Sequence, residues 1–309
     1  MKAVYIEKHG GPEVLKYGDM PDPVAKHGEV IVDIHAASIN GADWKVRQGE
    51  GYAKLSTFPY ILGRDFSGVI SFAAEGVEGV RAGDRVFGVC DAGQEGTYCE
   101  QIAMKASIIA KKPHTMSHVD AAALALTGLT ALVSVEDTLK LQKGETIVIH
   151  GGAGGVAAFA IQLAKHIGAR VITTASPANH DYVRSLGADQ IIDYHKEDFS
   201  KVVSGCDAVF DTVGGDVTQR SFSVLKPGGR AAFIASGAKA PPSPRADVTS
   251  LRPAVGRDRP HLERILELVA LGAIRPPEVR LFDLADARAA HELSQSRHLR
   301  GKLVFKVRG

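Results

Sequence analysis

The sequence has little cysteine, and its charges almost cancel. Three cysteines (Cys90, Cys99 and Cys206) among 309 residues cannot form a disulfide framework or a four-thiolate zinc site, and they fit a reducing compartment. Lys and Arg number 37 against 35 Asp and Glu. The resulting formal charge of +2 gives no general reason to bind nucleic acid or an acidic membrane surface.

Long hydrophobic runs are also absent. The longest stretch without an acidic residue, lysine, arginine or histidine, residues 121–135, includes threonine and serine and is 15 residues long, whereas a membrane span needs about 20 apolar residues. Residues 1–8 (MKAVYIEK) lack the apolar core of a signal peptide. Together these features predict a cytoplasmic protein that does not enter a membrane.

Glycine is abundant, with 33 in 309 residues, close to 11% where about 7% is usual. Such an excess indicates many tight turns or backbone that approaches a ligand closely. The hydrophobic share of 45% and the charged share of 23% are ordinary for globular proteins. At this length, two domains are expected, each with its own core.

The first third of the chain has the pattern of a β-rich domain. Short apolar runs at residues 30–36, 69–72 and 85–89 have glycine or a glycine-aspartate pair close to their ends. This spacing is typical of a small barrel or sandwich. Residues 302–307 alternate like an amphipathic strand and are expected to return to this domain. The predicted β-rich domain therefore comprises residues 1–116 and 280–309.

The middle of the chain predicts a doubly wound parallel sheet over residues 117–279. Its apolar runs begin 24, 20, 18 and 22 residues apart, about the length of a strand, a helix and two loops. Helical spacing of apolar residues follows the first run. The proline-rich stretch 237–259 is predicted to be a long loop. The five runs are residues 146–149, 170–174, 190–193, 208–211 and 230–234.

A glycine-rich turn, HGGAGGVA at residues 150–157, follows the first of these runs. Gly152, Gly154 and Ala157 fit the dinucleotide-binding pattern, with alanine in the third place. Small residues let the chain turn sharply and let a pyrophosphate reach backbone N–H groups at a helix N-terminus. The context between a strand and a helix favours a nucleotide site over a turn that binds no ligand.

The end of the second run indicates which nucleotide is bound. An NAD site usually has an acidic residue there to hold the ribose hydroxyls, but residues 173–176 are Thr-Thr-Ala-Ser. Because an acid would repel a 2′-phosphate, its absence favours NADPH. Ser176 could donate a hydrogen bond to that phosphate. It could also cap the helix that begins at Pro177, and both roles are compatible.

Ordered motifs along nearly the whole chain resemble the medium-chain dehydrogenase/reductase superfamily, specifically its zinc-independent quinone oxidoreductase branch, which is zeta-crystallin-like. The resemblance implies a GroES-like β-rich catalytic domain, a Rossmann domain for NADPH, an active site in the cleft and a homodimer. The motifs are GGPEVL at 10–15, NGAD at 40–43, GRDFSGV at 63–69, GDRV at 83–86, GLTA at 128–131, LGAD at 186–189 and GKLV at 301–304.

The same resemblance assigns roles to individual residues. Asn40, Asp43 and Thr130 would line the pocket for nicotinamide and substrate. Asp43 could equally orient a loop, and Thr130 could hydrogen-bond a backbone carbonyl. The cofactor would be bound by three groups of residues. The turn would hold the pyrophosphate through Gly152, Gly154, Gly155 and Val156, and Ser176 and Tyr194 would contact the 2′-phosphate. The C-terminal segment would contribute Arg300, Gly301 and Lys302.

A departure from zinc-dependent relatives predicts that no metal is bound. The positions that match the three zinc ligands of those relatives are Asn40, Arg64 and Leu126. Leucine cannot ligate a metal, and arginine stays protonated. The segment that would carry a structural zinc is also too short here and contains one cysteine, Cys90.

The chemistry expected is therefore hydride transfer from NADPH to a quinone without a metal. Asn40 would donate a hydrogen bond to the developing oxyanion, and Tyr52 is a candidate proton source, although packing is the commoner use of a tyrosine. Two alternatives stay open. One is reduction of an enone, an alkenal or an enoyl thioester, and the other is a non-catalytic NADPH-binding protein.

Overall fold

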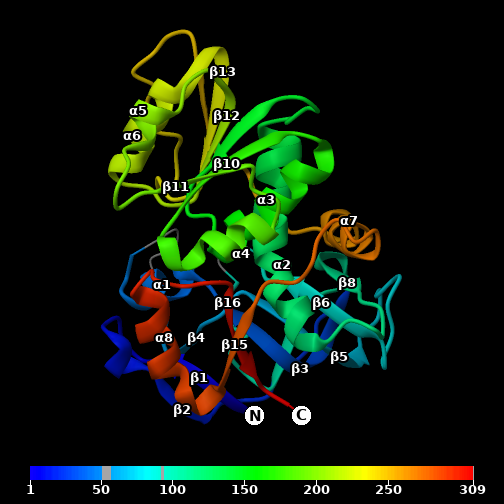
Figure 1. Cartoon of the computed structure of the whole chain (residues 1–309). Coiled ribbons are helices and arrows are strands. Elements are labelled where there is room, and N and C mark those ends of the chain that lie inside the picture. Colours follow the sequence, from blue (N-terminus) through cyan, green and yellow to red (C-terminus); the bar gives the residue numbers. More distant parts are fainter. Residues whose placement is uncertain (51–56, 92–93, 309) are drawn as a thin grey trace. The chain divides into compact units, whose positions relative to one another are not determined.

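The computed structural model describes residues 1–50, 57–91 and 94–308 (Figure 1). The chain forms two compact units. Unit 1 comprises Met1–Leu126, Arg257–Glu267 and Pro276–Gly309, and unit 2 comprises Thr127–Gly256 and Leu268–Arg275. Compared with the expected domains, unit 1 extends ten residues beyond residue 116 and includes most of a helix that was expected in the other domain.

Unit 1 is built on two β-sheets. A three-stranded sheet has the order β2-β1-β4, and a larger sheet of seven strands has the order β15-β16-β3-β5-β6-β8, with β7 also paired to β3. The inward-facing side chains of β3 alternate with half-buried ones along most of the strand, as expected for a sheet with one face on the core. The strands are β1 (Lys2–Ile6), β2 (Lys16–Asp19), β3 (Glu29–Ile39), β4 (Tyr60–Ile61), β5 (Asp65–Ala73), β6 (Arg85–Val89), β7 (Gln101–Lys105), β8 (Ile109–Lys111), β15 (Val279–Asp283) and β16 (Lys302–Lys306).

The last strand brings the end of the chain back into unit 1. In Figure 1 the red strand β16 runs beside the blue strand β3, and the two are antiparallel with Leu303 opposite Ile39. Strand β16 also pairs in parallel with β15. The predicted return of the C-terminal strand to the β-rich domain is therefore confirmed.

Unit 2 contains a six-stranded sheet in which every pair is parallel, in the order β11-β10-β9-β12-β13-β14. This confirms the predicted doubly wound sheet. The short strand β14 lies inside the predicted loop 237–259, because pairing with β13 supplies a partner that the local sequence does not signal. The strands are β9 (Thr146–Ile149), β10 (Arg170–Ala175), β11 (Gln190–Asp193), β12 (Cys206–Asp211), β13 (Leu225–Phe233) and β14 (Thr249–Leu251).

The helix that follows the glycine-rich turn is a core helix. Helix α3 (Gly155–Ile167) buries every side chain from Ala157 to Ala164, so all of its faces are packed over this length. It ends at Gly168, whose φ of 92° is the left-handed conformation that closes many helices. The other helices are α1 (Gly41–Arg47), α2 (His118–Leu132), α4 (His180–Ser185), α5 (Phe199–Val202), α6 (Asp216–Ser221), α7 (Arg259–Ala270) and α8 (Ala287–Gln295).

Helix α2 continues as a π-helical turn to Thr138, and together they span 21 residues. By length and composition this segment could cross a membrane, with a mean hydropathy of 1.5. However, 72% of its apolar window is buried inside the protein, as in the core helix of a globular domain. Its hydrophobicity is thus accounted for by packing.

Candidate active site

The glycine-rich turn of unit 2 is shaped by a close approach to strand β10. A Cβ atom on Gly152 would lie 2.3 Å from the hydroxyl oxygen of Thr173. That hydroxyl cannot easily move, because it donates a hydrogen bond of 2.7 Å to the carbonyl oxygen of Ile149. Glycine is therefore required at position 152 by the fold itself.

Gly154 is in a different situation. It precedes α3 as its N-cap with φ −75°, which any residue can adopt, and an added Cβ would meet only the carbonyl oxygen of Gly151 at 3.4 Å. Packing alone does not require glycine there. The absent side chain leaves the N-terminus of a 13-residue helix open, where unpaired N–H groups attract an anion. The turn therefore fits a dinucleotide pyrophosphate, with Gly155 and Val156 as the next two residues.

The buried side chain of His150 links this turn to neighbouring elements. The hydroxyl of Ser221 donates to the carbonyl oxygen of Val217 at 2.7 Å, so it accepts the Nε2–H of His150 at 3.2 Å. The other ring nitrogen faces the hydroxyl of Thr174 at 3.3 Å, and this hydroxyl accepts the backbone N–H of Gly151 at 3.1 Å. Burial lowers the pKa of His150 to about 4, so the ring is neutral at neutral pH. Sequence reasoning missed His150, although it begins the glycine motif.

The residues predicted to meet the 2′-phosphate lie at the ends of β10 and β11. Ser176 precedes a 3-10 turn, Pro177–Asn179, and its hydroxyl oxygen accepts a hydrogen bond of 3.1 Å from the side chain of Asn179. Its predicted capping bond to the backbone does not form, since no side-chain cap bond is present. Tyr194 is 50% exposed and packs against the ring of His195. The side chain of Tyr194 is thus exposed, and that of Ser176 is half-buried.

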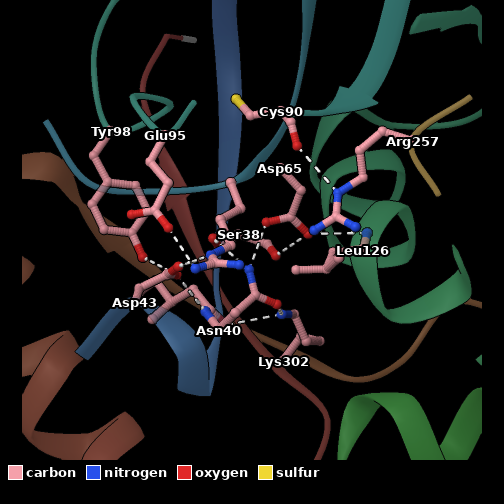
Figure 2. A network of polar contacts seen from close by, with 12 residues as sticks. Ser38, Asn40, Asp43, Asp65, Cys90, Glu95, Tyr98, Leu126, Arg257 and Lys302 are labelled. Atoms are coloured by element: carbon pink, nitrogen blue, oxygen red, sulfur yellow. Dashed lines mark hydrogen bonds and ion pairs between the residues drawn. The ribbon is translucent and has the colours of Figure 1, made fainter. Parts of the chain in front are cut away.

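In unit 1 the centre of the site is Asn40, at the end of strand β3 (Figure 2). Its side-chain Nδ2 donates to Oδ1 of Asp65 at 2.7 Å, and its Oδ1 accepts from the ammonium of Lys302 at 2.8 Å. Ser38 donates to the second carboxylate oxygen of Asp65 at 2.8 Å. Because both ends of the Asn40 amide are engaged, it acts here as a link between an anion and a cation.

Lys302 places a cation beside this amide. Its side chain is 6% exposed, and its ammonium also donates to the carbonyl oxygen of Ile39 at 2.8 Å. Burial lowers the pKa of Lys302, and the negative charge of Asp65 opposes that effect. Two of its three N–H donors are used, and the third has no hydrogen-bond partner among the residues that the structure describes. The predicted cofactor residue Lys302 therefore contacts the candidate substrate residue Asn40 directly.

The Asp43 carboxylate makes its contacts with other residues of unit 1. The carboxylate is fully buried, and Oδ2 accepts the backbone N–H of Asn40 at 2.8 Å and the hydroxyl of Tyr98 at 2.7 Å. The guanidinium Nε of Arg64 lies 3.5 Å from Oδ1, while Nη2 of Arg64 pairs with Glu95 at 2.5 Å. Burial raises the pKa of Glu95 to about 7. These contacts favour the alternative in which Asp43 orients the start of α1.

The positions that would hold a catalytic zinc do not fit one. Arg64 is a permanent cation paired with two carboxylates, and the side chain of Leu126 has no donor atom. The backbone N–H of Leu126 instead donates to Asp65 at 3.2 Å. Throughout residues 1–50, 57–91 and 94–308, no group of three or more potential metal-binding side chains is clustered.

The remaining predicted residues are distributed as follows. Thr130 lies on the part of α2 that belongs to unit 2 and is half-buried. Arg300 forms an ion pair with Glu278. Gly301 has φ 70°, and a Cβ there would lie 2.0 Å from the carbonyl oxygen of Glu278, so it serves the junction of β15 and β16. Tyr52 falls within residues 51–56, outside the described part of the chain.

Known protein families match two parts of the chain. The alcohol dehydrogenase GroES-like domain family matches residues 26–114, and the zinc-binding dehydrogenase family matches residues 186–305. The NADPH-dependent alkenal/one oxidoreductase of Arabidopsis thaliana chloroplasts is 32% identical over 98% of this chain and 79% of its own length. This chain belongs to the medium-chain dehydrogenase/reductase superfamily. It is therefore an oxidoreductase, as the motifs predicted.

Two solved structures of this superfamily match the fold along the whole chain. The quinone oxidoreductase of Coxiella burnetii has a TM-score of 0.91 and 36% identity, covering 100% of this chain and 99% of that one. The quinone oxidoreductase of Escherichia coli, solved in complex with NADPH, has a TM-score of 0.90 and 28% identity, covering 99% and 100%. The predicted fold, a GroES-like domain with a Rossmann sheet, is confirmed.

Proposed function

We propose that this protein reduces a small-molecule quinone with NADPH, by hydride transfer that needs no metal ion. The observation that carries the proposal is the set of side chains at the three zinc-ligand positions, Asn40, Arg64 and Leu126, which cannot hold zinc. Alcohol oxidation benefits from a Lewis acid that stabilises an alkoxide. A quinone needs less help, because its carbon is electrophilic and the developing charge spreads into a phenolate.

The residues that would hold NADPH are Gly152, Gly154, Gly155 and Val156 at the pyrophosphate, with Ser176 and Tyr194 at the 2′-phosphate. When bound, NADPH supplies the hydride. The absence of an acidic side chain at residues 173–176 supports the phosphorylated coenzyme over NADH. The relatives named above for NADPH support the same choice.

The groups that would stabilise the reduced acceptor are Lys302 and Asn40. The unused N–H of the Lys302 ammonium is a charge-assisted donor for an oxygen that gains negative charge. Asn40 holds this ammonium in place through its Oδ1. This assignment moves the direct donor role from Asn40 to Lys302, because both ends of the Asn40 amide already have partners. Tyr52 remains a proposed proton source.

A second acceptor class has a specific observation in its favour. The Arabidopsis relative is named for reduction of alkenals and alkenones. An α,β-unsaturated carbonyl presents the same electrophilic carbon and passes its charge to an enolate oxygen, so Lys302 would serve it equally. Reduction of an enone or alkenal is therefore the alternative function.

Steady-state assays would test the proposal. Oxidation of NADPH would be measured with a naphthoquinone, an alkenal and an enone as acceptors. Reduction of NADP⁺ would be measured separately with a primary alcohol as the hydride donor. We expect the quinone to give the highest kcat/KM and EDTA to leave that rate unchanged. A highest rate with the alkenal would favour the second function. Activity confined to the alcohol, or lost with EDTA and restored by Zn²⁺, would refute the metal-free mechanism.

A further inference from the structure

Unit 1 contains a cavity of about 300 Å³ that the proposed reaction does not use. Its volume is at the lower end of the range for small-molecule sites, about 300–1,000 Å³. Its walls come from β3, β5, β6, the first turn of α2 and the end of the chain. The lining residues are His35, Val69, Arg85, His118, Val119, Lys306 and Arg308.

The cavity has more positive charge than the protein neutralises. In the described part of the chain, the side chains of Arg85 and Lys306 make no ion pair and no hydrogen bond. Arg308 lies 3.7 Å from Asp33 and donates to the carbonyl oxygen of Glu100 at 3.3 Å, but its buried Nε has no partner there. Three cations thus face one carboxylate, and guanidinium groups with unused donors suit a multiply charged oxyanion.

The cavity also has an apolar wall, which includes two stacked histidine rings. The rings of His35 and His118 lie 4.4 Å apart between centroids and 17° from parallel. Ser67 donates its hydroxyl proton to the carbonyl oxygen of Val86 at 2.8 Å, so it accepts the Nδ1–H of His118 at 2.8 Å. This contact fixes the orientation of the His118 ring, and with it the stacked pair.

Their surroundings favour the neutral form of both rings. Burial, followed by the positive charges of Lys112 and Arg85, lowers the pKa of His118 to about 3. Burial also lowers the pKa of His35, helped by Arg308 and opposed by Asp33. Neutral stacked imidazoles present a flat π-face. Together with Val69 and Val119 they make an apolar wall beside the cationic one.

We propose that this cavity binds a phosphorylated small molecule with an aromatic or apolar body. The phosphate would lie against Arg85, Lys306 and Arg308, and the body against the histidine pair and the two valines. Inorganic phosphate would leave the apolar wall uncovered, and a monocarboxylate would compensate only one of the three cations. The site is distinct from the glycine-rich turn, which lies in unit 2, and from the Asn40 network.

NMR titration of the whole protein with phenyl phosphate tests the proposal, observing the C2–H signals of His35 and His118 assigned with His35→Gln and His118→Gln. We expect saturable shifts of both signals. Inorganic phosphate and benzoate should bind about fivefold more weakly or worse, because each lacks one half of the complementarity. Absence of saturable shifts, or equal affinity for inorganic phosphate or benzoate, would overturn the proposal.

Arg85→Gln is the direct variant, and Arg81→Gln is its matched control, with the same charge change four residues earlier in the chain. Arg85→Gln and, separately, Lys306→Gln should each weaken phenyl phosphate about fivefold or more, with thermal unfolding and NADPH turnover unchanged. Arg81→Gln should leave the affinity unchanged. An equal loss with Arg81→Gln would show a diffuse surface effect and would also overturn the proposal.

Discussion

At the scale of single residues, the buried link from Lys302 through Asn40 to Asp65 is the part of unit 1 with the clearest chemical role. Two charged groups that are almost fully buried are held apart by one amide, and each is hydrogen-bonded to it. Burial raises the pKa of Asp65, while the Lys302 ammonium opposes that shift and favours the charged carboxylate. Such an arrangement holds the cation in one position and leaves it little conformational freedom.

Asn40→Ala should lower kcat for quinone reduction at least about tenfold while changing the KM for NADPH by less than about threefold. The reason is that Lys302 loses the contact that orients its ammonium, whereas the glycine-rich turn is untouched. Ser38→Ala is the matched control. It removes one bond to Asp65 but keeps the bond between Asn40 and Lys302, so it should cost less. Equal losses of kcat and NADPH affinity in Asn40→Ala would contradict the role.

At the scale of elements, the strand β9, the turn and helix α3 together form the proposed coenzyme site. Its two key glycines are present for different reasons, since Gly152 is confined by the hydroxyl of Thr173 and Gly154 is not confined by the protein. The neutral ring of His150 ties the turn to β10 and α6 through Thr174 and Ser221. The geometry of the turn is therefore set before any ligand arrives.

The substitutions Gly154→Ala and Gly152→Ala separate these two reasons. Gly154→Ala should change the free energy of unfolding by less than about 1 kcal/mol. It should nevertheless raise the KM for NADPH at least about tenfold, because its Cβ would occupy the space left for the pyrophosphate. Gly152→Ala should destabilise the protein by about 1–3 kcal/mol through overpacking. Thermal unfolding and NADPH titration measure both effects, and unchanged NADPH affinity in Gly154→Ala would place the coenzyme elsewhere.

At the scale of the whole molecule, buried histidines link stability to pH. Burial lowers the pKa of His150 to about 4 and that of His291 to about 3, below the value near 6.5 of an unfolded chain. The unfolded state therefore binds more protons as the pH falls below 6.5, and stability is lost in that direction. Glu95 acts oppositely between about pH 4.5 and 7, because burial raises its pKa.

The difference between the protein and His150→Gln isolates one of these groups. From pH 8 to 5 the thermal midpoint of the unmodified protein should fall more steeply than that of the variant. A single histidine contributes up to about 3 kcal/mol over its full titration range. Parallel curves for the two proteins, measured by circular dichroism, would show that His150 is not held neutral by burial.

One of the two edges of the parallel sheet, strand β14, bears on assembly. Strand β14 ends the sheet of unit 2 and pairs only with β13 in the described chain. An unpaired edge is a surface on which a second copy can continue a sheet. We expect a homodimer through this edge. Sedimentation velocity at micromolar concentration should give about twice the monomer mass of 32.8 kDa, and a single monomeric species would contradict the expectation.

The sequence by itself determined the parallel sheet and the place of the glycine-rich turn. Strands β9 and β11 begin and end at the predicted residues, because buried parallel strands are continuous apolar runs and each is closed by local turn residues. The turn pattern marks the glycine at position 152, but the close approach of Thr173 on β10 that requires it arises only in the folded sheet.

Only the tertiary structure decided how the polar groups of unit 1 are used. Asn40 and Lys302 are 262 residues apart, and Arg64 reaches both Asp43 and Glu95, so no local pattern could show that these charges neutralise one another. The strand β14 and the cationic cavity arise in the same way. Hydrogen bonds and ion pairs between distant segments depend on sheet register, which is fixed only when the whole core is packed.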